Sequence, residues 1–119
     1  MVYTADSLSL AALECLVHFS SQTLPTDYLS FEIAVPSEAS VEAIDIASLP
    51  SDWQDEDPPV TTQTLGTGWI RSQRSLLLKV PSAIIPTEFN YLINPRHQDF
   101  SRLIIGQSMP FRFDPRLKQ

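Results

Sequence analysis

The sequence has only three glycines. That number is too small for the glycine-rich phosphate loop of P-loop enzymes or the Gly-x-Gly-x-x-Gly turn of a Rossmann fold, and neither motif is present. The Gly-x-Ser-x-Gly elbow that carries the nucleophile of α/β-hydrolases is also absent. The lack of phosphate-binding glycine motifs excludes a Rossmann-type dinucleotide-binding fold.

Cysteine is nearly absent as well. The single Cys15 cannot form a disulfide within the chain, which suits a reducing compartment such as the cytoplasm. Cys15 and His18 have the spacing of two metal ligands on one helix, but only His97 remains elsewhere, and a zinc site needs three or four ligands. We therefore expect Cys15 and His18 to be packed helix residues, and we expect no metal. A Cys15–His97 dyad stays open, although no recognisable motif surrounds either residue.

The first 70 residues contain no lysine or arginine. All eight basic residues lie between Arg71 and Lys118, and the net charge is -6, which disfavours non-specific nucleic-acid binding. An anionic substrate would therefore be bound by the C-terminal part, by helix N-termini, or by residues outside this chain.

No apolar run approaches the roughly 20 residues of a membrane span, and no basic signal-peptide region is visible. We expect a cytoplasmic protein without a membrane partner.

The 119 residues, 43% of them hydrophobic, fit one domain of ordinary composition. Helical periodicity predicts a helix over residues 7–19, capped by Asp6 or Thr4 and covered on most sides. A second helix is expected over residues 61–72, with Leu65, Trp69 and Ile70 as its apolar side. Arg71 and Arg74 are interpreted as cations near the end of that helix.

Strand patterns cluster later in the chain. Residues 28–35 alternate and predict a half-buried strand with Leu29, Phe31, Ile33 and Val35 on its buried face. Residues 75–80 predict a central strand. Further candidates are residues 41–46, 89–93, 103–105 and 111–113, whereas 51–59 predict an acidic loop. Because the predicted helices come early in the chain and most predicted strands come late, we expect an α+β fold with a mixed or antiparallel sheet.

Two residues stand out, each with an ordinary alternative. Glu14 is an acidic residue within an apolar helix, and periodicity alone favours a carboxylate on the helix's solvated stripe. Ser82 follows Pro81 at the end of a strand, where a serine more often caps a turn than takes part in chemistry. The start of the chain, Met1-Val2-Tyr3, is typical of the end of a strand that begins earlier, so we expect a domain truncated at its N-terminus.

Three segments resemble one family, that of the RES domains, in order and spacing. The first resembles the Tyr-Thr-Ser…Ala…Glu…His segment of that family and comprises residues 2–8, Ala11, Ala12, Glu14, Val17 and His18. The second resembles the strand that follows and comprises residues 28–33 and a later proline. The third is the most specific and comprises residues 69–72, 76–86 and 88–95, His97, Asp99, Phe100 and residues 111–117.

The resemblance implies an ADP-ribosyltransferase-like α+β fold in which residues 1–119 form a single RES domain, incomplete at its N-terminus. RES domains are named for an Arg, a Glu and a Ser. The Glu corresponds to Glu14 and the Ser to Ser82. The Arg precedes the helix in the family, and this chain has no counterpart for it.

The resemblance also implies an activity. RES domains are toxins of bacterial type II toxin–antitoxin systems that consume NAD⁺ or transfer ADP-ribose, each neutralised by an Xre-type antitoxin. NAD⁺ is then a substrate, and no cofactor is expected. Glu14 would face the ribosyl cation, Ser82 would orient the ribose or the carboxylate, and Tyr3 would stack on the nicotinamide or donate a hydrogen bond. The alternative is a truncated, inactive RES module that only binds its antitoxin; an incomplete sheet edge would favour homo-oligomers.

Overall fold

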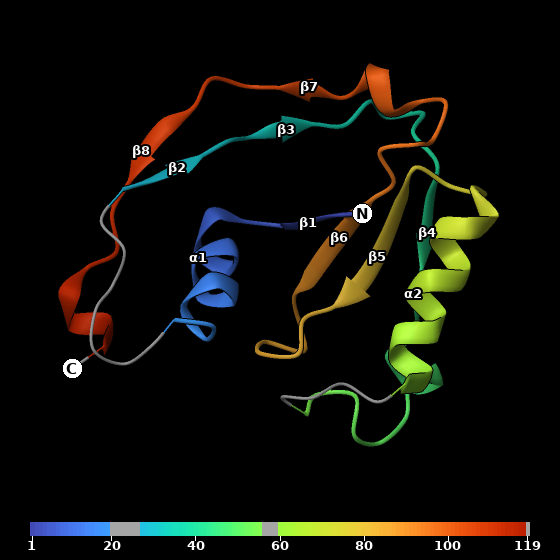
Figure 1. The fold of residues 1–119 in the computed structure, drawn as a ribbon, viewed down its shortest axis with the longest axis horizontal. Coiled ribbons are helices and arrows are strands. Elements are labelled where there is room, and N and C mark those ends of the chain that lie inside the picture. Colours follow the sequence, from blue (N-terminus) through green and yellow to red (C-terminus); the bar gives the residue numbers. More distant parts are fainter. Residues whose placement is uncertain (20–26, 56–59, 119) are drawn as a thin grey trace.

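The computed structural model describes residues 1–19, 27–55 and 60–118. Its centre is a four-stranded sheet in the order β1-β6-β5-β4. In the view of Figure 1, α1 lies to the left of this sheet, α2 lies to the right beside β4, and a long two-stranded ribbon runs above. The strands are β1 (Val2–Ala5), β4 (Val41–Ala43), β5 (Leu77–Pro81) and β6 (Phe89–Ile93). β6 pairs antiparallel with β1 and β5, while β4 pairs parallel with β5. The expected α+β fold with a mixed sheet is confirmed.

The central position of β5 explains the apolar run Leu76-Leu77-Leu78 at its start. Leu78 packs with Trp69 and Leu92 on one face of the sheet. Leu77 packs with Ile93 on the other face, in a cluster that also contains Leu76. A strand buried on both faces cannot alternate between apolar and polar residues. The expected central strand is therefore confirmed, shifted so that it begins at Leu77.

Helix α2 (Val60–Ser72) confirms the second expected helix. Trp69 is buried, and its Nε1 donates a hydrogen bond to Ser75 Oγ at 2.8 Å. Leu65, expected on the same apolar side, is 42% exposed and does not share the buried position of Trp69. Gln73 follows with φ 53°, the left-handed conformation that commonly ends a helix. Arg74, beyond that turn, pairs with Glu42 at 2.9 Å.

Helix α1 (Leu8–Leu16) is shorter than the expected helix and differs in its cap. Ser7 caps it, because its Oγ accepts the Leu10 N–H at 3.1 Å. The expectation of Asp6 or Thr4 as the cap was wrong: Thr4 Oγ1 donates instead to the Tyr91 carbonyl in the sheet. The expected coverage on most sides was also wrong, since only Leu10 and Leu16 are buried within α1.

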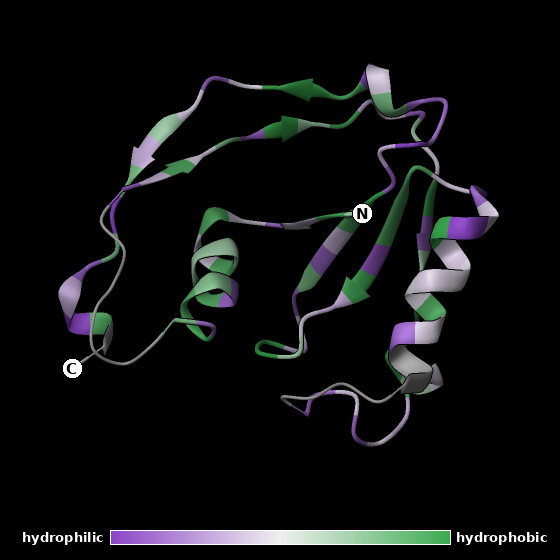
Figure 2. Cartoon of the chain, in the orientation of Figure 1, coloured by the Kyte–Doolittle hydropathy of each residue, from purple (hydrophilic) through white to green (hydrophobic). Residues whose placement is uncertain are grey.

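The expected strand over residues 28–35 is divided into β2 (Tyr28–Ser30) and β3 (Ile33–Ala34). These pair with β8 (Met109–Phe111) and β7 (Ile104–Ile105), respectively, to form the ribbon. Its predicted buried face was wrong, because Leu29 is 58% exposed and Phe31 is 55% exposed. The ribbon gains no third strand within the part of the chain that the structure describes, so apolar residues remain on its surface (Figure 2). Ile33 alone of the predicted face joins the core.

Four aromatic rings join the end of α1 to the ribbon. Phe113, only 4% exposed, has its ring centroid 5.2 Å from that of Phe19 and 5.7 Å from that of Tyr28. Phe111 completes the group, 4.9 Å from Phe113. The contacts with Phe113 are edge-to-face, the arrangement that aromatic quadrupoles favour. These rings hold the C-terminal segment beside α1.

The described residues also form the short 3₁₀ helices η1 (Ile46–Ser48), η2 (Phe100–Arg102) and η3 (Pro115–Lys118). The strand expected over residues 41–46 stops at Ala43, since Asp45 caps η1. The acidic loop expected over residues 51–59 is described as far as Asp55, and its remainder lies outside the described residues. Within those residues, no helix is long and apolar enough to cross a bilayer.

Candidate active site

Glu14, in the middle of α1, is half-buried and held by two side chains from the sheet region. Its Oε1 accepts a hydrogen bond from Ser82 Oγ at 2.7 Å and another from Asn90 Nδ2 at 2.8 Å. A carboxylate on a solvated helix stripe would have neither contact. The interpretation favoured by periodicity alone was therefore wrong, because the sheet lies within reach of this side of α1.

Ser82 reaches Glu14 because the chain turns sharply after β5. Its backbone N–H donates to the Glu88 carbonyl at 2.9 Å, and its Oγ accepts the N–H groups of Ile84 and Ile85, both at 3.1 Å. The hydroxyl hydrogen is left for Glu14. Ser82 is therefore both the turn cap expected from the sequence and a partner of Glu14. Its side chain is fully buried, at 0% exposure.

Asn90 is a site residue to which the sequence analysis gave no role. It lies on β6, directly opposite Ala5 of β1 and Val80 of β5. Partners across a sheet share one face, so Asn90 lies on the face where Val80 packs against the Trp69 cluster. An amide facing inward on an otherwise largely apolar strand was the available signal. Its interpretation required the register of β6, which the sequence alone does not show.

Tyr3 lies outside the hydrogen-bonded cluster of the other two predicted residues. It lies on β1 opposite Leu92 and is 74% exposed. Within residues 1–19, 27–55 and 60–118 no hydrogen bond joins it to Glu14 or Ser82. Tyr3 nevertheless shares a sheet face with Asn90, displaced by two residues, or about 7 Å along the strand. The structure thus brings Glu14 and Ser82 together and places Tyr3 nearby on an open face.

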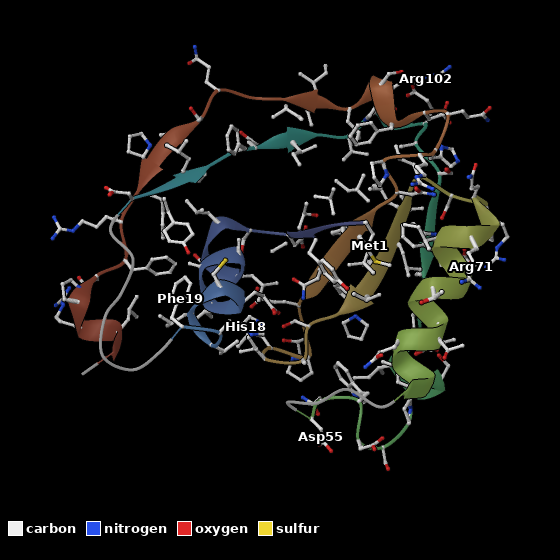
Figure 3. All side chains as sticks on the ribbon, viewed as in Figure 1. Met1, His18, Phe19, Asp55, Arg71 and Arg102 are labelled. Carbon is white, nitrogen blue, oxygen red and sulfur yellow. The ribbon has the colours of Figure 1, made fainter. Side chains whose placement is uncertain are left out.

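No cation neutralises Glu14 among the ion pairs of the described residues, which involve Glu42, Asp99 and Asp114 instead. Figure 3 shows Arg71 on α2 and Arg102 in η2, across the molecule from His18 and Phe19 at the end of α1. The charge on Glu14 is therefore stabilised by neutral hydrogen-bond donors. Because no paired cation cancels its charge, a carboxylate held in this way can stabilise a positive charge that develops beside it.

The alternative sites from the sequence find little support. Cys15 and His18 are both exposed, so the expectation that they pack within the protein was wrong. His97 is 9% exposed, and its Nδ1 accepts the Asp99 N–H at 3.1 Å. Across the described ranges, no group of three or more His, Cys, Asp or Glu residues is arranged to hold a metal ion.

A hollow on the surface of the ribbon lies apart from this cluster. It is lined by Asp27, Tyr28, Leu29, Pro110, Phe111 and Arg112. None of Tyr3, Glu14, Ser82 and Asn90 lines it. The hydrogen-bonded cluster around Glu14, rather than this hollow, is therefore the candidate active site.

Comparison with known families agrees with the resemblance found in the sequence. The RES domain model matches residues 1–114, nearly the whole chain. The chain belongs to the RES domain family. A "Toxin Res" of Yersinia enterocolitica is 39% identical over 118 residues, which cover 98% of this chain and 77% of that protein. A "Toxin Res" of Photorhabdus laumondii is 41% identical over 117 residues, covering 98% of this RES chain and 74% of that protein.

A third relative is named for an activity. The "Prs ADP-ribosylating toxin" of Sphingobium sp. is 40% identical over 119 residues, covering 98% of the chain and 74% of that protein. RES-family relatives are thus named as toxins, and one of them as an ADP-ribosylating toxin.

Proposed function

We propose that this RES domain is the toxin of a type II toxin–antitoxin system and cleaves the nicotinamide–ribose bond of NAD⁺, with Glu14 as its catalytic carboxylate. The observation that carries the proposal is the half-buried Glu14 side chain, held through one oxygen by Ser82 and Asn90. The name of the Sphingobium relative as an ADP-ribosylating toxin supports the same chemistry, because ADP-ribosyl transfer from NAD⁺ breaks this bond.

Cleavage of the nicotinamide–ribose bond is favoured by a fixed negative charge beside the ribose. As the bond breaks, its electron pair leaves with nicotinamide, and the positive charge moves onto the ribose as an oxocarbenium-like species. A nucleophile, water or an acceptor side chain, then bonds to the anomeric carbon and loses its proton. A carboxylate beside the ribose stabilises this transition state more than the ground state, where the charge is on the nicotinamide ring. Glu14 supplies that carboxylate on a helix.

The other two predicted residues take different roles in this proposal. Ser82 orients the Glu14 carboxylate, because its hydroxyl donates a hydrogen bond to that group. Its other expected role, orienting the ribose, is less well supported, since a side chain with 0% exposure does not reach a substrate unless the turn opens. Tyr3 has an exposed ring that is free to stack on the nicotinamide, and aromatic stacking of this kind adds about 0.5–1.5 kcal/mol. Glu14 alone is proposed to act on the reacting atoms.

We also propose an Xre-type antitoxin as the protein partner and the cytoplasm as the place of action. The toxin names of the relatives support a neutralising partner, since a producing cell must restrain a toxin that consumes its NAD⁺. Free Cys15 agrees with a reducing compartment. The alternative, a RES module that only binds its antitoxin, predicts co-purification with a small helix-turn-helix protein and no turnover of NAD⁺.

Glu14→Gln tests the catalytic role. The amide oxygen of glutamine still accepts from Ser82 and Asn90, so the change removes the charge with little change in shape. We expect nicotinamide release from NAD⁺ to fall by about 100- to 1,000-fold, the effect of removing one electrostatic stabiliser of a transition state. The measurement is the initial rate of nicotinamide release by chromatography.

Glu38→Gln is the matched control, because Glu38 is an exposed carboxylate whose one hydrogen bond among the described residues comes from the neighbouring Ser37 hydroxyl. It should retain the original rate, and both variants should unfold at the original urea midpoint. Undiminished release by Glu14→Gln would contradict the proposal. No release by the unaltered protein, together with co-purification of the helix-turn-helix partner, would support the binding-only alternative.

A further inference from the structure

The two donors on Glu14 meet on a single oxygen. Ser82 and Asn90 both donate to Oε1, and no donor within the described residues bonds to Oε2. We propose that Asn90 is a positioning residue of this site: together with Ser82 it anchors Oε1, so that Oε2 is the oxygen presented to the substrate. This inference rests on the proposed function, and it assigns a role to a residue outside the Arg, Glu and Ser of the family name.

Chemistry fixes the orientation of the Asn90 amide. A flipped amide would place Oδ1 against the Glu14 carboxylate, and two acceptors would then repel each other at hydrogen-bond distance. With Nδ2 directed at Glu14, Oδ1 is buried and has no hydrogen-bond partner among the described residues. A buried acceptor without a partner destabilises the folded state relative to an apolar side chain in the same place. The favourable contact made by this amide is therefore its bond to Glu14.

The two donors come from different elements. Ser82 is in the turn that follows β5, and Asn90 is on β6, so Oε1 is fixed from two directions. Once Oε1 is fixed, the position of Oε2 depends only on rotation of the carboxylate about that oxygen. An acceptor positioned before the reaction needs no reorganisation when charge develops on the ribose. Loss of Asn90 should therefore lower kcat and leave substrate binding nearly unchanged.

Asn90→Leu removes the donor with little change in size. We expect kcat for nicotinamide release to fall about 10- to 100-fold, as for one hydrogen bond to a charged group, with KM changed by less than about threefold. Thr4→Val is the control, since it removes a 2.8 Å hydrogen bond to Tyr91 on the other face of the same strands. That control should retain the original kcat. An Asn90→Leu protein with the original kcat would overturn the proposal.

Asn90→Asp keeps the shape and makes the donor depend on pH. The new carboxyl can donate to Glu14 only while the pair shares a proton; at higher pH two like charges face each other. Activity relative to the unaltered protein should therefore fall as pH rises, a trend that a merely structural role would not produce. A ratio independent of pH between 5 and 8 would contradict the positioning role.

The anchoring contact can also be tested without NAD⁺. In ¹⁵N-labelled protein, the side-chain amide protons of Asn90 should shift on Glu14→Gln, because the charged acceptor becomes neutral, and should stay in place on Glu38→Gln. If the unaltered protein releases no nicotinamide but this shift occurs, the proposed reaction fails while the anchoring of Glu14 stands. If release occurs but the amide protons do not respond, the reaction stands and the role of Asn90 is overturned.

Discussion

At the scale of single residues, the negative charge of Glu14 depends on two neutral donors. Ser82 and Asn90 each donate a hydrogen bond of less than 3 Å to Oε1. Hydrogen bonds to a charged group contribute about 1.5–3 kcal/mol each, which offsets the loss of water around a half-buried carboxylate. Because the donors are uncharged, their field does not cancel that of the carboxylate at the position of the ribose. This distinguishes Glu14 from Glu42, Asp99 and Asp114, each of which pairs with an arginine.

Asp114 shows the opposite arrangement and gives a pH-dependent prediction. Hydrogen bonds from the Arg116 guanidinium, helped by the Arg116 backbone N–H, lower the pKa of Asp114 below its usual value. A lowered carboxyl pKa stabilises the fold above the unfolded-state pKa, and this contribution is lost as pH falls through the lowered value. Arg116→Ala should bring the Asp114 pKa back up, as measured by carboxyl-carbon NMR titration.

The same pair should have little effect on stability at neutral pH, since both side chains lie at the surface. We expect the urea midpoint of Arg116→Ala to equal that of the unaltered protein at pH 7. A clear loss of stability there would show that Arg116 supports the fold through contacts other than the one with Asp114.

At the scale of elements, β6 and the ribbon differ in how much of their apolar surface is covered. Leu92 of β6 is 6% exposed and packs with Trp69 and Leu78, whereas Leu29 of β2 is 58% exposed. Leu92→Ala should lower the free energy of unfolding by about 2–5 kcal/mol, because it leaves a cavity in the core. Leu29→Ala is the matched control and should change it by only about 0.5 kcal/mol. Equilibrium urea unfolding measures both, and equal losses would mean that the ribbon face is covered.

At the scale of the whole molecule, the aromatic group joins segments that are distant in sequence. Phe113 contacts Phe19 after α1 and Tyr28 at the start of the ribbon, so removal of its ring should loosen both. Phe113→Ala should lower the free energy of unfolding by about 3–5 kcal/mol. Amide hydrogen exchange should accelerate in α1 as well as in β2 and β8. Phe31→Ala, which removes a ring 55% exposed, is the control; faster exchange confined to β8 would contradict the proposed link.

Much of the fold could be predicted from local sequence patterns. The bounds of β6, the extent of α2 within one residue and the central position of β5 all follow from the spacing of apolar residues and from prolines. The cap of α1 and the buried face of the ribbon were predicted wrongly. Thr4 lies in a strand that uses its hydroxyl elsewhere, and Leu29 and Phe31 lack a covering layer. Both errors have one cause: whether a residue caps a helix or is buried depends here on contacts with other elements of the fold.

The amino-acid sequence by itself determined the class of fold, the helix that carries Glu14, and the membership in the RES family, because periodicity and motif spacing are local properties. Only the tertiary structure decided that Glu14 meets a serine 68 residues away and an asparagine 76 residues away in the chain. Those contacts depend on the register of β6 between β1 and β5 and on the turn after β5, which together bring the two donors to one oxygen. Register is set by pairing between strands, so no single stretch of sequence contains it.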